Sequence, residues 1–227
     1  MGATMMEAGF ITKIMDGLRD AWEAHQTTGP NKKYPELDDI VETDYFVVLS
    51  RFALGNPHTF FTILQASRAD KGESVEQTWD WISTEWFQHM DSMANIERQK
   101  LSCLALTRLF DMSPFPPCLL NRLQDYFSMW TSIISELQEG SDPGADNAIR
   151  IPPTEPYPYE THADIRTRHH LEQDPVHSVN TLQFVKEKLQ KLVGDCGGEI
   201  AFKENCVSNI DRDVLNEFAR TTGISLL

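Results

Sequence analysis

The chain has 227 residues, of which 41% are hydrophobic and 24% are charged, proportions that are ordinary for a soluble globular protein. Its formal net charge of −14 at pH 7 argues against non-specific binding to DNA or RNA, because a phosphate backbone selects lysine and arginine. The charge suits a basic protein partner, and solubility alone would explain it equally well.

The cysteines and the apolar segments predict a reducing compartment and no membrane span. The four cysteines stand at spacings typical of neither a metal site nor a disulfide framework: Cys103, Cys118, Cys196 and Cys206. The chain has no Asn-x-Ser/Thr motif, and acidic residues stand where a secretory leader would carry lysine or arginine. We therefore expect a cytosolic or nuclear protein without a leader. The run Tyr45–Leu49 is too short to cross a bilayer.

The first predicted helix runs from about residue 5 to about residue 25 and has one apolar and one acidic face. Its apolar residues recur at helical spacing: Phe10, Ile11, Ile14, Leu18, Ala21 and Trp22. At about 100° per residue, Asp16, Asp20 and Glu23 fall together on the opposite face. This acidic ridge is a candidate site for a basic ligand, and a solvated helix face is the simpler alternative.

The second and third predicted helices form a tight pair. A helix over 37–54 turns one apolar set inward: Ile40, Val41, Tyr45, Val48, Leu49 and Phe52. Gly55 ends this helix and Asn56-Pro57 starts the next one at once, because proline is favoured at the first helical position. So short a connection places the two helices side by side and antiparallel.

The following helix carries a second candidate binding residue. Ser74 and Gln77 form a capping box before a helix whose apolar stripe extends from Val75 to Met93. Trp81 lies roughly 140° from that stripe. It is either an exposed anchor for a peptide ligand or, as we favour, a contact to a second neighbouring helix.

Two more apolar helices complete this part of the chain. One follows Asn95, and the other follows the prolines at 114–117 and ends near Leu137. Four amphipathic helices within residues 56–137 cannot bury their stripes alone, because each needs neighbours on two sides. We therefore predict an all-α chain built as an α-solenoid of antiparallel helix pairs, such as HEAT repeats.

The composition changes beyond this array. Glycine, proline, aspartate and tyrosine dominate 139–173, and 151–159 reads as extended polyproline-type chain. That stretch is either a ligand for a proline-binding domain or, as we favour, a linker over the helices, with a short helix over 162–171. Further helices are predicted over 178–193 and after Asp211. The predicted organisation is a helical array over 1–140, an irregular insert over 141–175 and capping helices over 176–227.

No motif for catalysis is present. The chain lacks the G-x-S-x-G, H-E-x-x-H and P-loop patterns. Residues 209–220 mimic a calcium loop, but Val214 stands where glycine is needed and Arg220 where glutamate is needed, so Asp211 is better explained as a helix cap. The neighbouring pair His169-His170 diverges on a helix and is expected on the surface. We predict that the chain is not an enzyme and has no catalytic residue, no cofactor and no metal site.

Three stretches of the chain resemble a known family. Residues 45–61 and the segment from Trp86 to Leu106 resemble the late HEAT repeats of karyopherin-β (importin-β superfamily) nuclear transport receptors. Asp174-Pro175-Val176-His177 and the helix that follows are similar to the C-terminal tail of the importin-eleven type and its fungal relatives. The resemblance covers most of the chain.

This resemblance implies a superhelical array that carries protein cargo on its inner surface, contacts Phe-Gly nucleoporin repeats in grooves between helices, and shuttles through the nuclear pore between nucleus and cytoplasm. It also implies regulation by the GTPase Ran in the full-length receptor. From the fungal relatives it implies a role in ribosome biogenesis, through export of the large-subunit precursor. Neither direct nucleic-acid binding nor membrane insertion is expected.

Two functions follow as alternatives. Full receptors are several times longer and contact Ran mainly through an N-terminal region, so we expect this chain to be a C-terminal portion that binds protein cargo. The acidic ridge and Trp81 are its candidate binding residues. The alternative is a general HEAT-repeat scaffold for protein assembly without transport activity.

Overall fold

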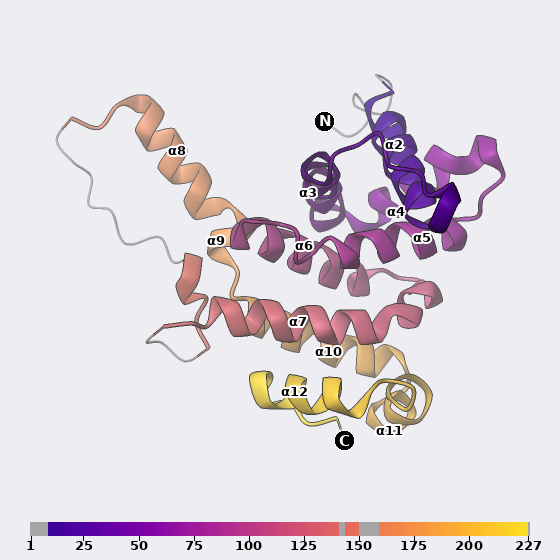
Figure 1. The fold of residues 1–227 in the computed structure, drawn as a ribbon. Coiled ribbons are helices and arrows are strands. Elements are labelled where there is room, and N and C mark those ends of the chain that lie inside the picture. The colour runs from indigo at the N-terminus through magenta and orange to yellow at the C-terminus, as the bar shows by residue number, and fades with distance from the viewer. Residues whose placement is uncertain (1–8, 141–143, 150–158, 227) are drawn as a thin grey trace.

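The computed structural model describes residues 9–140, 144–149 and 159–226, apart from the side chain of Asp70. Over these residues the secondary structure is helical and no strand is present. The helices stack against one another as a layered array (Figure 1). The predicted all-α solenoid of helix pairs is therefore confirmed.

The described helices are short, and short connections join most of them. Those of the first half are α2 Phe10–His25, α3 Asp39–Gly55, α4 Pro57–Arg68, α5 Val75–Gln88, α6 Ile96–Arg108 and α7 Leu123–Leu137. Those of the second half are α8 His162–Gln173, α9 Pro175–Ser178, α10 Thr181–Asp195, α11 Glu199–Phe202 and α12 Arg212–Thr222. A π-helical turn lies at Lys203–Val207. Short 3-10 turns lie at Gly29–Asn31, Ala69–Lys71, Leu109–Asp111, Pro117–Arg122 and Asn147–Ile149.

Side-chain caps begin several helices where the sequence indicates. At the start of α4 the side chain of Asn56 accepts a hydrogen bond from the N–H of Thr59 at 3.0 Å. The predicted capping box of α5 is confirmed: the Ser74 hydroxyl accepts from the N–H of Gln77 at 3.3 Å, and the Gln77 side chain accepts from the N–H of Ser74 at 2.9 Å. Because these bonds satisfy N–H groups of the first turn, the helices can start directly after tight connections.

Each inner helix packs against more than one neighbour. α2 lies against α5, and α4 contacts both α3 and α5. α3 packs on α6, α6 on α7, and α7 on α12, while α10 covers α6 and the turn at Leu109–Asp111. In Figure 1, α6, α7 and α12 follow one another from the middle of the molecule to its lower edge. The apolar stripes are thus buried between successive layers.

Aromatic side chains fill the spaces between layers. The largest fully buried ones include Trp79, Trp86, Trp130, Tyr126, Phe46 and Phe60. Phe46 of α3 stacks on Trp86 of α5 with 5.3 Å between ring centroids. Phe127 of α7 meets Phe218 of α12 edge to face at 4.8 Å. Pairs of this kind contribute about 0.5–1.5 kcal/mol beyond the burial of their area, so they hold the layers in register.

The buried face of α3 differs from the predicted one. Ile40 and Val41 were predicted to point inward, but Ile40 is 69% exposed and Val41 is also exposed. Glu42 is completely buried instead, together with Phe46. Since α3 is apolar around much of its circumference, periodicity alone does not select a face. The contacts with α4 and α6 on two sides select it.

The first helix follows its predicted pattern closely. The structure describes it from Phe10, and the part predicted over residues 5–8 lies outside the described residues. Ile11, Ile14 and Leu18 are buried as predicted, whereas Phe10, predicted to be inward, is 41% exposed at the end of the helix. No helix in the described ranges combines the length and the apolar character that a bilayer span needs.

The C-terminal part differs from the prediction in two places. The helix predicted over 178–193 corresponds to α10, which begins at Thr181 because the side chain of Asn180 caps it, and the short helix α9 before it was not predicted. The helical segment over 199–207 was not predicted, since glycines precede it and no clear apolar period marks it. The Asp211 carboxylate accepts a hydrogen bond from the N–H of Asp213 at 2.8 Å, which makes it the cap of α12.

The predicted insert contains the expected short helix. α8 stands away from the array in Figure 1, and none of its residues is buried. Of the polyproline-type stretch predicted over 151–159, residues 151–158 lie outside the described residues, and Tyr159 lies at the start of the α8 region. The division of the chain at residues 140 and 175 stays a prediction.

Candidate functional site

Two of the three carboxylates in the acidic ridge already pair with arginine. Arg68 of α4 donates from Nη1 to Oδ1 of Asp16 at 2.9 Å, and Arg19 donates from Nε to Oε1 of Glu23 at 2.8 Å. Asp20 is exposed. The ridge is therefore less negative than its sequence indicates, and its role in binding a basic partner stays a prediction.

Trp81 is 2% exposed and packs against α2. Its indole Nε1 donates a hydrogen bond to Oε2 of Glu73 at 3.2 Å. The Arg19 guanidinium lies 4.4 Å from the ring centroid of Trp22 and 5.3 Å from that of Trp81. The structure thus has the packing arrangement that we favoured for Trp81. A docked peptide cannot reach the buried ring, so Trp81 is not an exposed anchor.

An ionic network joins the acidic ridge to Trp81. Arg68 donates to Asp16 and also to Oε1 of Glu73 at 3.2 Å, and Glu73 accepts from Trp81 as well. Burial opposes ionisation of Glu73, but the hydrogen bonds from Arg68 and Trp81 outweigh it and hold the pKa of Glu73 below its usual value. The sequence analysis missed Arg68 and Glu73, because Arg68 meets Asp16 across 52 positions of sequence.

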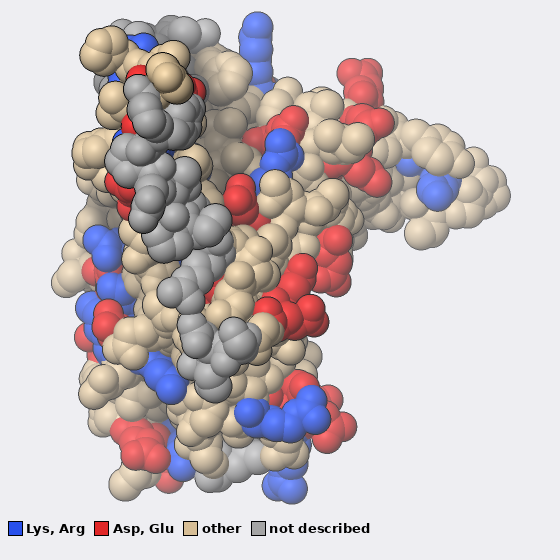
Figure 2. Space-filling model, turned by 90° about the vertical axis from the view of Figure 1, so that its left-hand side faces the viewer, with Lys and Arg blue, Asp and Glu red and all other residues tan. Residues whose placement is uncertain are grey.

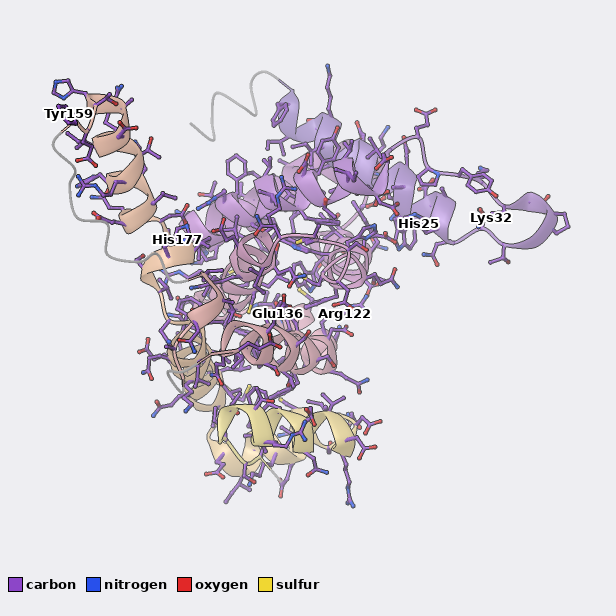
Figure 3. The ribbon with its side chains drawn as sticks, turned by 60° about the vertical axis from the view of Figure 1, so that its left-hand side comes forward. His25, Lys32, Arg122, Glu136, Tyr159 and His177 are labelled. Carbon is purple, nitrogen blue, oxygen red and sulfur yellow. The ribbon has the colours of Figure 1, made fainter. Side chains whose placement is uncertain are left out.

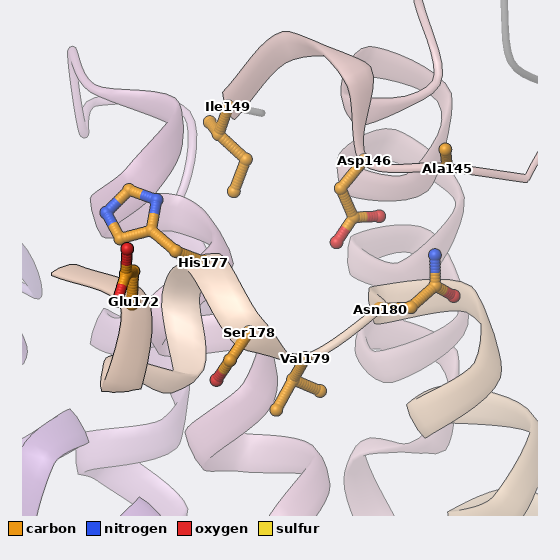
Figure 4. Close-up of a pocket in the computed structure, with 8 residues that line it drawn as sticks. All are labelled: Ala145, Asp146, Ile149, Glu172, His177, Ser178, Val179 and Asn180. Carbon is orange, nitrogen blue, oxygen red and sulfur yellow. The ribbon is translucent and has the colours of Figure 1, made fainter. Parts of the chain in front are cut away.

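A pocket of about 400 Å³ opens where the segment 144–149 meets the junction of α8, α9 and α10 (Figure 4). Its lining residues are Ala145, Asp146, Ile149, Glu172, His177, Ser178, Val179 and Asn180. Asp146 and His177 lie on opposite sides of it (Figure 4). The pocket combines apolar and polar groups, which suits a docked side chain or peptide turn.

A buried ion pair supports this pocket. Lys100 of α6 is buried, and its Nζ donates to Oδ2 of Asp146 at 2.6 Å and to the backbone carbonyl of Val179 at 2.7 Å. The same Asp146 oxygen accepts from the hydroxyl of Thr181 at 2.8 Å. These bonds hold the 144–149 segment and the start of α10 against α6. The Asp146 carboxylate is therefore engaged in holding these segments together.

Two glutamates and two histidines meet where α2, α3 and α5 converge. Glu42, in the first turn of α3, and Glu85, near the end of α5, are completely buried. His25, the last residue of α2, places Nδ1 2.9 Å from Oε2 of Glu85. His89, just after α5, places Nε2 3.2 Å from Oε2 of Glu42. We call these four residues the Glu–His cluster; its exposed member His25 is labelled in Figure 3.

The Glu–His cluster was not predicted from the sequence. Glu85 and His89 are four residues apart, a spacing that places two side chains on one helix face, and this was the local signal available. His25 is 60 positions away from Glu85. Only the packing of α2 and α3 against α5 brings the remaining members together.

The charged side chains of the surface are mixed. On the face shown in Figure 2, acidic and basic side chains are interspersed and do not form one continuous acidic patch. Tyr159, which is 89% exposed, lies at the far end of the α8 projection in Figure 3. On this face the acidic side chains are thus not gathered into one patch.

Three of the four cysteines have raised pKa values, which makes their thiols poor nucleophiles. Burial raises the pKa of Cys103 to about 12, and it raises the pKa of Cys118 and of Cys196 to about 11. Because the thiolate is the reactive form, these three thiols are protonated and unreactive near neutral pH. Cys103, Cys118 and Cys196 are therefore poor candidates for a covalent nucleophile.

Comparison with known proteins places these features in a family. A family model described as "Importin-11-like, TPR repeats" matches residues 1–223. Importin-11 from Mus musculus is 28% identical over 181 residues, which cover 73% of this chain, and importin-11 from Homo sapiens matches to the same extent. Importin beta-like protein kap113 from Schizosaccharomyces pombe is 25% identical over 197 residues, which cover 83% of this chain.

The matched region is a small share of each relative. The chain spans 18% of the length of these curated proteins. No solved structure matches it. The family description speaks of TPR repeats where HEAT repeats were expected, and both are stacks of antiparallel helix pairs. From the match over 1–223, the relatives and the stacked helices, we conclude that the chain belongs to the importin-11-like family within the importin-β (karyopherin-β) superfamily.

Proposed function

We propose that this chain forms part of a nuclear transport receptor and binds protein cargo that moves between nucleus and cytoplasm through the nuclear pore. The observation that carries the proposal is the importin-11-like match over residues 1–223. The layered helices, which leave their outer faces to solvent, support recognition by surface complementarity. The net charge of −14 supports a basic cargo.

Three further features belong to the same proposal. Phe-Gly nucleoporin repeats would bind weakly in grooves between helices, and Ran would regulate cargo binding in the longer receptor. Precursors of the large ribosomal subunit are a candidate cargo class for export. The cargo would contact the helical array over 1–140, with the helices over 176–227 closing its end.

Binding assays with the 227-residue chain test the proposal. We expect weak, saturable binding to immobilised Phe-Gly repeat peptides, and none to matched peptides in which serine replaces phenylalanine. We also expect binding to lysine-rich cargo peptides that weakens as salt is added, because exposed charges are screened within about 8–10 Å at physiological ionic strength. Failure to bind either peptide class at low salt would contradict a transport role.

A general assembly scaffold is the second candidate function. The observation that favours it is the pairing of Asp16 with Arg68 and of Glu23 with Arg19, which reduces the charge available to a basic cargo. A scaffold would bind assembly partners without accumulating at the nuclear envelope. Imaging the full-length protein in cells separates the two functions, since a transport receptor accumulates at that envelope.

A further inference from the structure

The Glu–His cluster contains buried negative charge that the protein leaves incompletely compensated. In the described part of the chain, both oxygens of Glu42 and Oε1 of Glu85 are buried without a hydrogen-bond partner. Both carboxylates lie beside histidines: Nδ1 of His25 is 2.9 Å from Oε2 of Glu85, and Nε2 of His89 is 3.2 Å from Oε2 of Glu42. An ionised pair of carboxylates here needs a further cation.

The orientation of His89 points to the same need. Its Nδ1 lies 2.9 Å from the backbone carbonyl oxygen of Glu85, an atom that can only accept a hydrogen bond. Nδ1 therefore carries the proton, and a neutral His89 presents the lone pair of Nε2 to Oε2 of Glu42 at 3.2 Å. Two lone pairs that face each other at this distance repel. A proton on either group or a metal ion near both would relieve the repulsion.

We propose that His25, Glu42 and Glu85 bind one divalent metal ion of the zinc class. One ligand atom from each residue can be chosen so that all three lie within 4.8 Å of one another. Zinc bonds to nitrogen and carboxylate oxygen are about 2.0–2.2 Å long, so a modest contraction of this triplet would surround an ion. Imidazole as a ligand selects zinc-like metals over magnesium and calcium.

The surroundings of the triplet are those of a structural metal site. Its two carboxylates come from buried positions on α3 and α5, and the exposed His25 at the end of α2 gives an ion a route from solvent. A second triplet, Asp39, Glu42 and His89, shares Glu42 and lies beside the first. His89 belongs to this second triplet, and because a backbone carbonyl holds its Nδ1, its Nε2 faces Glu42. The ion would tie three helices together.

Metal titration of the 227-residue chain tests the proposal. After treatment with a chelator, we expect saturable binding of one zinc or cobalt(II) ion per chain, a higher midpoint of thermal unfolding with zinc, and no such effect with magnesium. Bound cobalt(II) should show visible absorption bands from a nitrogen and oxygen ligand set. His25→Ala should weaken zinc binding by about tenfold or more, because it removes a direct ligand while changing an exposed side chain.

Two further variants make the outcome decisive. Glu85→Gln should also abolish tight binding, and if it fails to fold, the exposed His25→Ala still provides the test. The control is the double variant His169→Ala/His170→Ala on the exposed helix α8, which should bind zinc as the parent does. No saturable zinc binding, unchanged binding in His25→Ala, or binding lost in the α8 control would each overturn the proposal and leave a proton-sharing cluster.

Discussion

Glu73 connects three helices through two hydrogen bonds and one ion pair, and its charge stabilises that connection. It lies just before α5, accepts from Arg68 at the end of α4 and from Trp81 within α5, and has Arg19 of α2 at 3.5 Å. Its side chain is mostly buried, so solvent screens these contacts little. The ionised carboxylate is therefore favoured in the folded protein over the unfolded chain.

The pH dependence of stability should show this preference. A carboxyl whose folded pKa is lowered contributes stability that is present above its unfolded pKa, near 4.5 for Glu73, and is lost as the pH falls through the folded value. Glu73→Gln should lower the free energy of unfolding by about 2 kcal/mol at pH 7. Urea unfolding measured from pH 7 to pH 3 should show that the difference in free energy of unfolding between parent and variant decreases below about pH 4.5.

A matched control separates this effect from a general loss of negative charge. Glu204 is exposed on the π-helical turn, far along the chain from α4 and α5. Glu204→Gln should leave stability within about 0.5 kcal/mol of the parent at every pH tested. If the stability difference between the parent and Glu73→Gln stayed constant down to pH 3, the proposed role of the ionised Glu73 carboxylate would be contradicted.

At the scale of elements, α12 is held to the array mainly by one aromatic residue. Phe218 is completely buried, 4.8 Å from the ring centroid of Phe127 and 6.0 Å from that of Trp130. Leu215 and Thr222 are the other buried residues of this short helix. A helix of 11 residues is marginal in isolation, so its order depends on this contact with α7.

Phe218→Ala should therefore destabilise the protein strongly. Removing a fully buried phenylalanine leaves a cavity, and the expected loss is about 3–5 kcal/mol in the free energy of unfolding, measured by urea denaturation. Trp130 fluorescence should change as the variant loosens the α7–α12 contact. Ile200→Ala, at a residue that is 76% exposed, should change stability by less than about 0.5 kcal/mol. Equal effects of the two substitutions would show that α12 is not docked as described.

At the scale of the whole molecule, two explanations for the binding of a basic cargo can be separated: attraction by the net charge of −14 and contact with a local acidic ridge. A long-range attraction for basic cargo depends on the total charge, whereas a binding ridge depends on particular side chains. Asp20 is the ridge residue to test, because reversing Asp16 or Glu23 would also break their pairs with Arg68 and Arg19.

Asp20→Lys should weaken the binding of a lysine-rich peptide about two- to fivefold at low salt. This is the effect expected when an exposed charge pair worth about 0.5–1 kcal/mol is lost. The difference should fade at high salt, and titration calorimetry at two ionic strengths measures both. Glu204→Lys changes the net charge equally at a distant exposed position and should have a smaller effect. Equal weakening by both variants would remove the ridge as a local site.

Much of this architecture could be predicted from local patterns. The caps at Asn56, Ser74 and Asp211, and the periodic stripe that includes Trp79 and Trp86, are readable because a helix start and an apolar face depend on residues within a few positions of each other. The same periodicity failed for Ile40 and Val41 on α3, whose apolar residues surround most of the helix.

The sequence by itself therefore determined that this chain is an all-α stack of helix pairs, because capping and amphipathic spacing are local properties. Only the tertiary structure decided which carboxylates are neutralised, that Trp81 is covered by α2, and that Glu42 is buried beside His89. Each of these contacts is made between residues that lie tens of positions apart in the sequence. They depend on the rotation and depth at which one helix packs on another, which the spacing within either helix leaves open.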